Sequence, residues 1–114
     1  MNDCIFCKIA SGAIPATLVH DSERVVAFRD LNPQAPQHLL VIPRRHIATL
    51  NDLTAEDGAL SGELIEVARQ LAAELGLAES GYRLVFNCNA DGGQSVYHIH
   101  LHLLGGRSLR WPPG

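Results

Sequence analysis

The chain has 114 residues, of which 46% are hydrophobic and 18% charged, and nine Lys and Arg against twelve Asp and Glu give a formal net charge of −3. These values suit one packed domain over residues 1–114 and exclude a disordered chain and a basic nucleic-acid-binding platform. No apolar run suits a signal peptide or a membrane span, and three cysteines do not make a disulfide framework. We expect a reduced, soluble, cytoplasmic protein that binds neither nucleic acid nor membrane.

The first part of the chain predicts a short helix followed by three strands. Residues 4–10 indicate a helical turn that ends near Gly12, and residues 17–20 and 24–28 indicate two short strands joined by a turn. Two prolines exclude helix from residues 32–36. The nearly continuous apolar run over residues 38–42 is typical of a central strand that is covered on both faces.

The second part predicts one long helix between strands. Thr54 is a suitable N-cap for this helix, and Gly76 is a suitable residue to end it. Between them, apolar residues recur at three- and four-residue spacing and form one stripe, which comprises Leu60, Leu64, Val67, Ala68, Leu71 and Leu75. Residues 82–87 and 97–104 predict two further strands, separated by a turn at residues 89–93. We expect an α+β fold with an antiparallel sheet, one long helix and one short helix.

Three of the six histidines alternate within five residues of the last predicted strand, at His98, His100 and His102. Residues two apart in a strand point to the same face, so we expect the three imidazoles to lie in a row on one face of the sheet. The opposite face would then carry the apolar residues between and after them, namely Ile99, Leu101 and Leu103.

Three interpretations of this histidine row compete. Ordinary surface or core histidines explain it poorly, because strand faces favour β-branched and aromatic residues. A metal site that uses all three is disfavoured, since the outer pair would lie about 13 Å apart along an extended strand and zinc–nitrogen bonds are about 2.1 Å long. One or two of the three remain available to a metal that has other ligands from elsewhere in the chain.

The third interpretation is nucleophilic catalysis at phosphorus. Imidazole has an ordinary pKa of about 6.5 and is therefore mostly uncharged and nucleophilic at neutral pH. If the central His100 attacks through one ring nitrogen, the other nitrogen must keep its proton and donate it to an acceptor such as a backbone carbonyl. The preceding loop, residues 91–95, supplies backbone N–H groups that suit an anion, and Ser95 adds a hydroxyl.

Residues 92–107, with their Gly-Gly-Gln-Ser followed by the alternating histidines, resemble the signature of the histidine triad (HIT) family in its Hint branch. The resemblance extends through residues 28–36 and 40–46 and ends at the Trp-Pro-Pro-Gly of residues 111–114. It implies a homodimer in which two five-stranded protomers form one ten-stranded sheet. It also implies a purine nucleoside phosphoramidase that cleaves the P–N bond of adenosine 5′-phosphoramidates, and also acts on aminoacyl-adenylates, through a nucleotidyl-histidine intermediate, without a cofactor for catalysis.

The resemblance also implies roles for individual residues. The catalytic set comprises the nucleophile His100, the flanking His98 and His102, His38 behind the triad, and Ser95. Asp30 matches the carboxylate that accepts hydrogen bonds from the ribose hydroxyls. The other nucleotide-binding residues are Asn87, Gly93, Gln94 and Ser95 near the phosphate, and Phe6, Ile9, Phe28 and Leu31 around the purine. The tail, residues 105–114, is implied to cross the dimer, where Trp111 takes part in substrate selection.

Cys4 and Cys7 form a CxxC pair, which is half of a zinc site. Several HIT proteins carry a structural zinc on such a pair and two histidines, and the resemblance places His46 and His98 at those positions. A structural zinc and two unmetallated thiols remain as alternatives at this point. Cys88 has no sequence partner and fits a buried small residue.

Two other functions remain open besides the phosphoramidase. One is a nucleotide-binding regulator or scaffold whose partner is a protein. The other is a dinucleoside polyphosphate hydrolase of the Fhit type, which the Trp-Pro-Pro-Gly tail disfavours. The sequence does not identify the physiological substrate or the source of the proton for the leaving amine. Arg29 stands where some Hint relatives have His, which leaves selectivity at the rim of the site undetermined.

Overall fold

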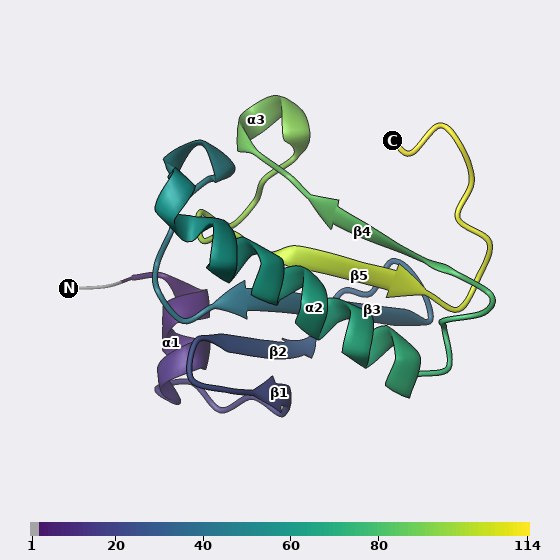
Figure 1. The fold of residues 1–114 in the computed structure, drawn as a ribbon, viewed down its shortest axis with the longest axis horizontal. Helices are drawn as coiled ribbons and strands as arrows, with labels where there is room; N and C mark the ends of the chain where they lie inside the picture. The colour runs from purple at the N-terminus through teal and green to yellow at the C-terminus, as the bar shows by residue number, and fades with distance from the viewer. Residues whose placement is uncertain (1–2) are drawn as a thin grey trace.

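A computed structural model describes residues 3–114 as a five-stranded antiparallel sheet with a helix on each face (Figure 1). The strand order β1-β2-β3-β5-β4 places β3 at the centre and leaves β1 and β4 at the edges. In chain order the elements are α1 (Ile5–Ser11), β1 (Leu18–Asp21), β2 (Val25–Arg29), β3 (Gln37–Pro43), the 3-10 turns η1 (Leu50–Asp52) and η2 (Ala55–Asp57), α2 (Gly58–Glu74), β4 (Tyr82–Phe86), α3 (Asn89–Gly92) and β5 (Leu101–Gly105).

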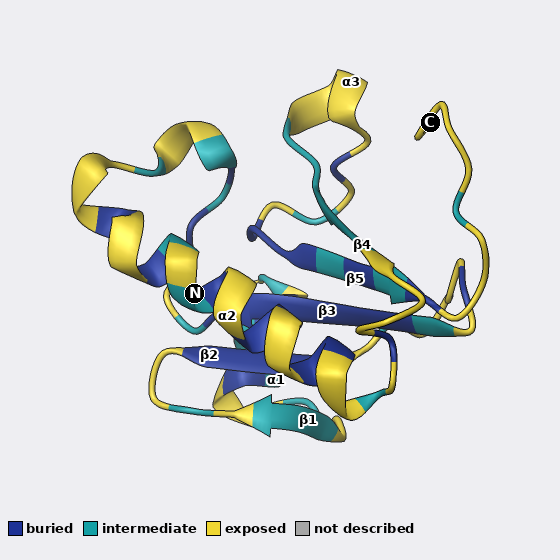
Figure 2. Cartoon of the chain, turned by 45° about the vertical axis from the view of Figure 1, so that its right-hand side comes forward, coloured by how far each residue is buried: buried dark blue, intermediate teal, exposed yellow. Residues whose placement is uncertain are grey.

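The larger core lies between α2 and one face of the sheet. Alternate residues of each strand point to this face because the side-chain period of a strand is two. They pack against the apolar stripe of α2 that the sequence predicts, and the buried set from the sheet comprises Val25, Ala27, Leu39, Val41, Leu101 and Leu103. Figure 2 shows β3 buried along most of its length and α2 exposed on its outer side. Helix packing against this face fixes the position of β5, which carries part of the histidine row.

The smaller core lies on the opposite face, beneath α1. Phe6 and Ala10 of α1 pack on the other set of alternating residues, which comprises Val26, Phe28, Leu40 and Ile42. Cys4 caps the first turn of α1, since its sulfur accepts from the backbone N–H of Cys7. Gly12 ends the helix at φ 82°, a left-handed conformation that a Cβ would disfavour. The chain therefore turns back over the sheet directly after α1.

The predicted fold class is confirmed, but three expected elements differ in extent. The strand expected over residues 97–104 is wrong at its start: β5 begins at Leu101, so His98 and His100 precede it. The long helix begins at Gly58 rather than at Thr54, because Thr54 and Asp57 form a capping box around the 3-10 turn η2. The turn expected at residues 89–93 contains one helical turn, α3. Gly76 has φ 75° just beyond the end of α2, as its left-handed role requires.

Within residues 3–114, none of the helices combines the length and apolar character that crossing a membrane requires.

Candidate active site

The face of the sheet that α1 covers holds a cavity of about 530 Å³. Its wall is formed by α1, the segment after α1, the end of β2 and the loop before the histidine row. Eight of the residues predicted for the site line it, namely Phe6, Ile9, Phe28, Asp30, Leu31, Ser95, His100 and His102. The structure thus brings the expected nucleophile, ribose carboxylate and purine walls to one hollow.

The three histidines of the row share this face even though two of them precede β5. Phe6 of α1 contacts both His98 and His100 edge-on, with ring centroids 6.0 and 5.1 Å apart, and the rings of His100 and His102 lie 4.9 Å apart. Ile99, Leu101 and Leu103 lie in the core beneath α2. The predicted division of the two faces is confirmed, because the irregular backbone before β5 keeps the alternation.

His100 is held by a backbone carbonyl, as a nucleophilic imidazole requires. Its Nδ1 lies 2.8 Å from the carbonyl oxygen of His98. A carbonyl only accepts, so Nδ1 carries the proton and Nε2 of the neutral ring carries a lone pair. His100 lines the cavity although the residue itself is buried. Its ring is therefore fixed in the tautomer that leaves the Nε2 lone pair available.

A chain of hydrogen bonds behind the triad fixes the tautomer of His102. The backbone N–H of Gln34 donates to Nδ1 of His38 at 3.0 Å, so the proton of a neutral His38 ring lies on Nε2. That N–H donates to Nδ1 of His102 at 2.9 Å. The Nε2 of His102 consequently carries the remaining proton, and among the described residues this buried atom has no hydrogen-bond partner. It is a donor available to a ligand in the cavity that His102 lines.

Burial favours the neutral form of both histidines in this hydrogen-bond chain, His38 and His102. It lowers the pKa of His102 to about 4, with smaller contributions in the same direction from His100 and His38. Burial also lowers the pKa of His38, and the charge of Asp30 opposes this effect only in part. The 3.5 Å contact between Asp30 and His38 is therefore a contact of a carboxylate with a neutral ring. Asp30 also accepts from the backbone N–H of Asn32.

The loop before the histidine row is built around Gln94 rather than left open. Gln94 is buried, and its side-chain amide contacts three backbone groups of the protein. Gly93 follows α3 at φ 81°, and Ser95 is exposed and lines the cavity. Ser95 and Gly93 are thus accessible to a ligand, whereas the side chain of Gln94 is directed into the protein.

Several residues that line the cavity have no distinctive sequence pattern. Ile14, Pro15, Ala16 and Thr17 line the cavity because Gly12 turns the chain back over it. The turn is fixed by the backbone N–H of Ile14, which donates to the carbonyl of Lys8. The left-handed preference of Gly12 was the one readable cue.

Two other predicted residues lie apart from the cavity lining. Asn87 is half-buried directly after β4, and Trp111 is 81% exposed in the tail. The Arg83 side chain of β4 holds the tail by donating to the carbonyls of Leu109 and Arg110. Arg29 borders the cavity, but its side chain donates to Gln37. Strand alternation places Arg29 and Gln37 on the face that α2 covers, away from the predicted purine-binding residues.

The CxxC pair and two histidines form a second cluster with the geometry of a metal site. The Nε2–H of His98 donates to the carbonyl of Pro43 at 2.8 Å, which leaves its Nδ1 with a lone pair. This Nδ1 lies 3.4 Å from each of the sulfurs of Cys4 and Cys7, and Nδ1 of His46 lies 3.3 Å from His98 Nδ1 and from the sulfur of Cys7. Ligands at the corners of a zinc tetrahedron are separated by about 3.3 to 3.8 Å. The donor set and its spacing therefore fit tetrahedral zinc.

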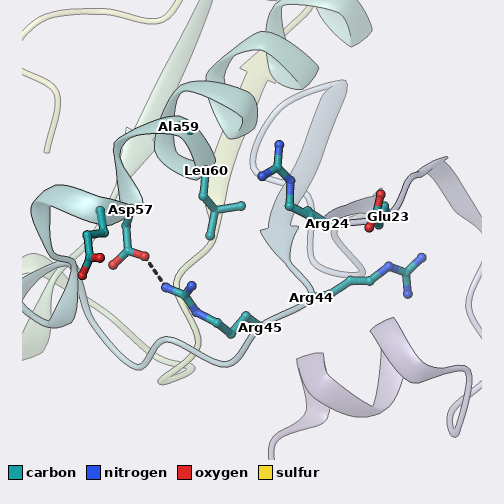
Figure 3. A pocket seen from close by; sticks show the side chains of 8 residues that line it. Glu23, Arg24, Arg44, Arg45, Asp57, Ala59 and Leu60 are labelled. Carbon is teal, nitrogen blue, oxygen red and sulfur yellow. Dashed lines mark hydrogen bonds and ion pairs between the residues drawn. The ribbon is translucent and has the colours of Figure 1, made fainter.

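A second hollow, of about 350 Å³, lies where β2 begins, β3 ends and α2 begins (Figure 3). Its three arginines are each paired with a carboxylate: Arg24 with Glu63, Arg44 with Asp21 and Arg45 with Asp57. The residues that line it include no histidine, cysteine or serine. This hollow thus offers paired charges and no nucleophile, unlike the cavity that His100 lines.

The fold and the cavity together define a small α+β protein with a row of histidines beside one cavity. A family model described as the HIT domain matches residues 11–109, so the chain belongs to the HIT domain family. It is 51% identical over 107 residues to the purine nucleoside phosphoramidase of Escherichia coli, covering 94% of this chain and 90% of that protein.

Solved structures agree with this assignment. A HIT family hydrolase from Legionella pneumophila has a TM-score of 0.97 and 59% identity, covering 98% of this chain and all of its own. A histidine triad nucleotide-binding protein from Candida albicans has a TM-score of 0.82 and 33% identity, covering 96% of this chain and 83% of its own. The predicted family is therefore confirmed.

Proposed function

We propose that this chain is a purine nucleoside phosphoramidase that hydrolyses adenosine 5′-phosphoramidates, and also aminoacyl-adenylates, to AMP and the corresponding amine or amino acid. The observation that carries the proposal is His100, whose Nδ1 is occupied by a carbonyl and whose Nε2 is free to attack in a cavity of nucleotide size. The similarity to the phosphoramidase of Escherichia coli supports the choice of substrate.

The cavity offers each part of such a nucleotide a suitable environment. Phe6 and Phe28 pack edge-on with centroids 5.4 Å apart, and with Ile9 and the exposed Leu31 they provide apolar walls for the purine. Asp30 has one carboxylate oxygen at the backbone of Asn32, and the carboxylate retains acceptor capacity for the ribose hydroxyls. We assign the phosphate to the part of the cavity that is lined by Ser95 and His102, where the Nε2–H of His102 has no protein partner.

In the first step, Nε2 of His100 attacks the α-phosphorus and forms a P–N bond. The bond to the amine breaks, its electron pair stays on the amine nitrogen, and that nitrogen takes up a proton. The imidazole becomes positively charged, and the carbonyl of His98, 2.8 Å from Nδ1, stabilises this charge. In the second step, water attacks the phosphorus and releases one proton to the solvent, the bond to Nε2 breaks with its electron pair left on the ring, and AMP leaves with His100 neutral again.

The hydrogen-bond chain through His38 positions His102 and does not supply the proton for the amine. The chain ends at the backbone amide of Gln34, which cannot give up its proton at neutral pH. Neutral His102 therefore donates a hydrogen bond to the phosphate, consistent with its pKa of about 4. Ser95, which lines the cavity beside His100, is the relay that we assign to the leaving amine.

We also propose a homodimer that extends the sheet through β4. This edge strand presents Tyr82, which is 36% exposed, and the partly buried Leu84 and Phe86 on the face that α2 covers mainly over β2, β3 and β5. The other edge, β1, is interrupted by an irregularity near His20. Arg83 holds the tail, and Trp111 lies outside the cavity lining of its own chain. This placement suits a role for Trp111 in the site of the partner subunit. Sedimentation velocity should show a dimer that Tyr82→Glu weakens.

For the second cluster we propose a structural zinc on Cys4, Cys7, His46 and His98. The ion would tie the start of α1 to the triad segment and would supply no chemistry to the reaction, since His98 presents its carbonyl to His100 and its ring to the cluster. A reducing cytoplasm would keep both sulfurs available as ligands.

The proposed activity is tested by steady-state hydrolysis of an adenosine 5′-phosphoramidate beside a dinucleoside polyphosphate. We expect P–N hydrolysis to dominate and His100→Ala to lower kcat by about 10⁴-fold while AMP binding, measured by calorimetry, is retained. Preferred cleavage of the dinucleoside polyphosphate, or substantial turnover by His100→Ala, would contradict the proposal.

A further inference from the structure

The side chain of Gln94 makes three hydrogen bonds to backbone groups around the loop that precedes the triad. Its Nε2 donates to the carbonyl of Ala48 at 2.7 Å and to that of Val96 at 3.1 Å, and its Oε1 accepts from the backbone N–H of Asn89 at 2.9 Å. Both amide protons and one lone pair are thus used inside the protein. The residue is only 7% exposed, so its side chain is not available to a nucleotide.

The contact with Asn89 closes the loop on itself. Asn89 starts α3 at φ 61°, the left-handed region that non-glycine residues rarely occupy. Gln94 holds Asn89 from both sides, since its Oε1 accepts from the Asn89 N–H and its own N–H donates to the Asn89 carbonyl at 3.1 Å. The two ends of the α3 loop are therefore fixed relative to each other, directly before Ser95.

The contact with Ala48 fixes the same loop to the triad segment. The residue before Ala48, Ile47, accepts at its carbonyl from the backbone N–H of Ile99 at 2.8 Å. Ile99 lies between His98 and His100. The backbone of Ile47 and Ala48 thus contacts the histidine row at Ile99 and, through Gln94, the loop that precedes Ser95. Ser95, next to Gln94, is placed relative to His100 by these links.

We propose that Gln94 is a positioning residue for the transfer step: it acts on the substrate through Ser95, whose hydroxyl it holds beside the leaving amine, and does not touch the nucleotide. This inference rests on the proposed phosphoramidase activity. The position of Gln94 requires a planar group with two donated protons and one acceptor. Among natural side chains, only a primary amide has this combination.

The test is a double-mutant cycle with Gln94→Glu and Ser95→Ala, measured with a series of amine leaving groups. Glu has nearly the shape of Gln but replaces the amide nitrogen, and with it both donated protons, by one oxygen that faces the carbonyls of Ala48 and Val96. We expect Gln94→Glu to lower kcat by about 10²-fold, most for the most basic amines, with a smaller change in AMP affinity. The Gln94→Glu, Ser95→Ala double variant should be within about threefold of the slower single variant.

Controls separate positioning from general loss of structure. Gln70→Glu makes the same chemical change on the exposed side of α2 and should leave kcat unchanged. Gln94→Met removes the hydrogen bonds without adding a charge. Its kcat should also fall only slightly further when Ser95→Ala is added. Losses that multiply in the double variant, or that are equal for all amines, would overturn the role of Gln94 while the proposed function stands. A wild-type protein without P–N hydrolysis would overturn the proposed function itself.

Discussion

Two groups of side chains flank His100, and each brings its ligand atoms within 4.8 Å of one another. One comprises Cys4, Cys7, His46 and His98, and the other comprises Asp30, His38 and His102. In the first, the lone pair on Nδ1 of His98 faces two sulfurs and a second imidazole. In the second, the backbone N–H of Gln34 donates to His38, and the N–H of His38 donates to His102.

The difference between the two groups is set by the backbone rather than by residue type. His98 donates from Nε2 to the carbonyl of Pro43, whereas His38 accepts at Nδ1 from the N–H of Gln34. A carbonyl partner turns a lone pair towards the group, and an N–H partner turns a proton towards it. Similar imidazoles thus contribute to a set of four potential metal ligands on one side of His100 and to a chain of hydrogen-bond donors on the other.

The largest expected effect is on bound metal, which we expect only at the group of Cys4, Cys7, His46 and His98. The double variant Cys4→Ser, Cys7→Ser should lower bound zinc from about one ion per chain to near zero, because Ser oxygen is a poor zinc ligand. Its midpoint of thermal unfolding should also fall, since the ion links α1 to the triad segment. Metal analysis of protein purified without chelators provides the measurement. The matched control is Cys88→Ser, and equal zinc in both variants would remove the metal assignment.

A smaller effect is expected when the donor chain is cut. His38→Ala removes the group that fixes the tautomer of His102, and kcat should fall by roughly 10- to 100-fold. His38→Gln should recover most of this loss, because the Gln amide can accept from the N–H of Gln34 and donate to His102. Steady-state kinetics of the two variants with one phosphoramidate provide the comparison. Equal losses in both would show that the tautomer of His102 does not depend on His38.

The smallest effect concerns pH. The pKa of His102 is lowered to about 4 by burial, below its value in an unfolded chain. The unfolded state therefore binds the extra proton first, so this residue's contribution to stability is complete above about pH 6.5 and is lost as the pH falls towards 4. NMR titration of the His102 ring should give the low pKa directly. A midpoint near 6.5 would contradict the neutral donor chain.

The sequence predicts the secondary elements that have strong periodicity, and the structure confirms the stripe of α2 and the central position of β3. It also predicts that the histidine row shares one face, since alternation survives the loss of regular strand geometry at His98 and His100. The demand for a carbonyl at the second nitrogen of His100 follows from imidazole chemistry alone, and His98 supplies it.

Contacts between distant backbone groups could not be predicted in this way. Nothing in the local pattern of Gln94 indicates that its amide reaches Ala48, because that contact depends on how two loops meet in space. The same holds for Gln34, whose N–H determines the tautomer of His38, and for Ile14, which the Gly12 turn brings to the cavity. The four potential metal ligands Cys4, Cys7, His46 and His98 likewise converge only because α1 packs beside the triad segment.

The most direct measurement is mass spectrometry of the protein quenched during turnover of an adenosine 5′-phosphoramidate, followed by peptide mapping under conditions that preserve phosphohistidine bonds. The account predicts an AMP adduct on His100, absent from His100→Ala and accumulating when the second step is slowed. An adduct on another residue, or turnover without any adduct on the protein, would contradict attack by Nε2 of His100.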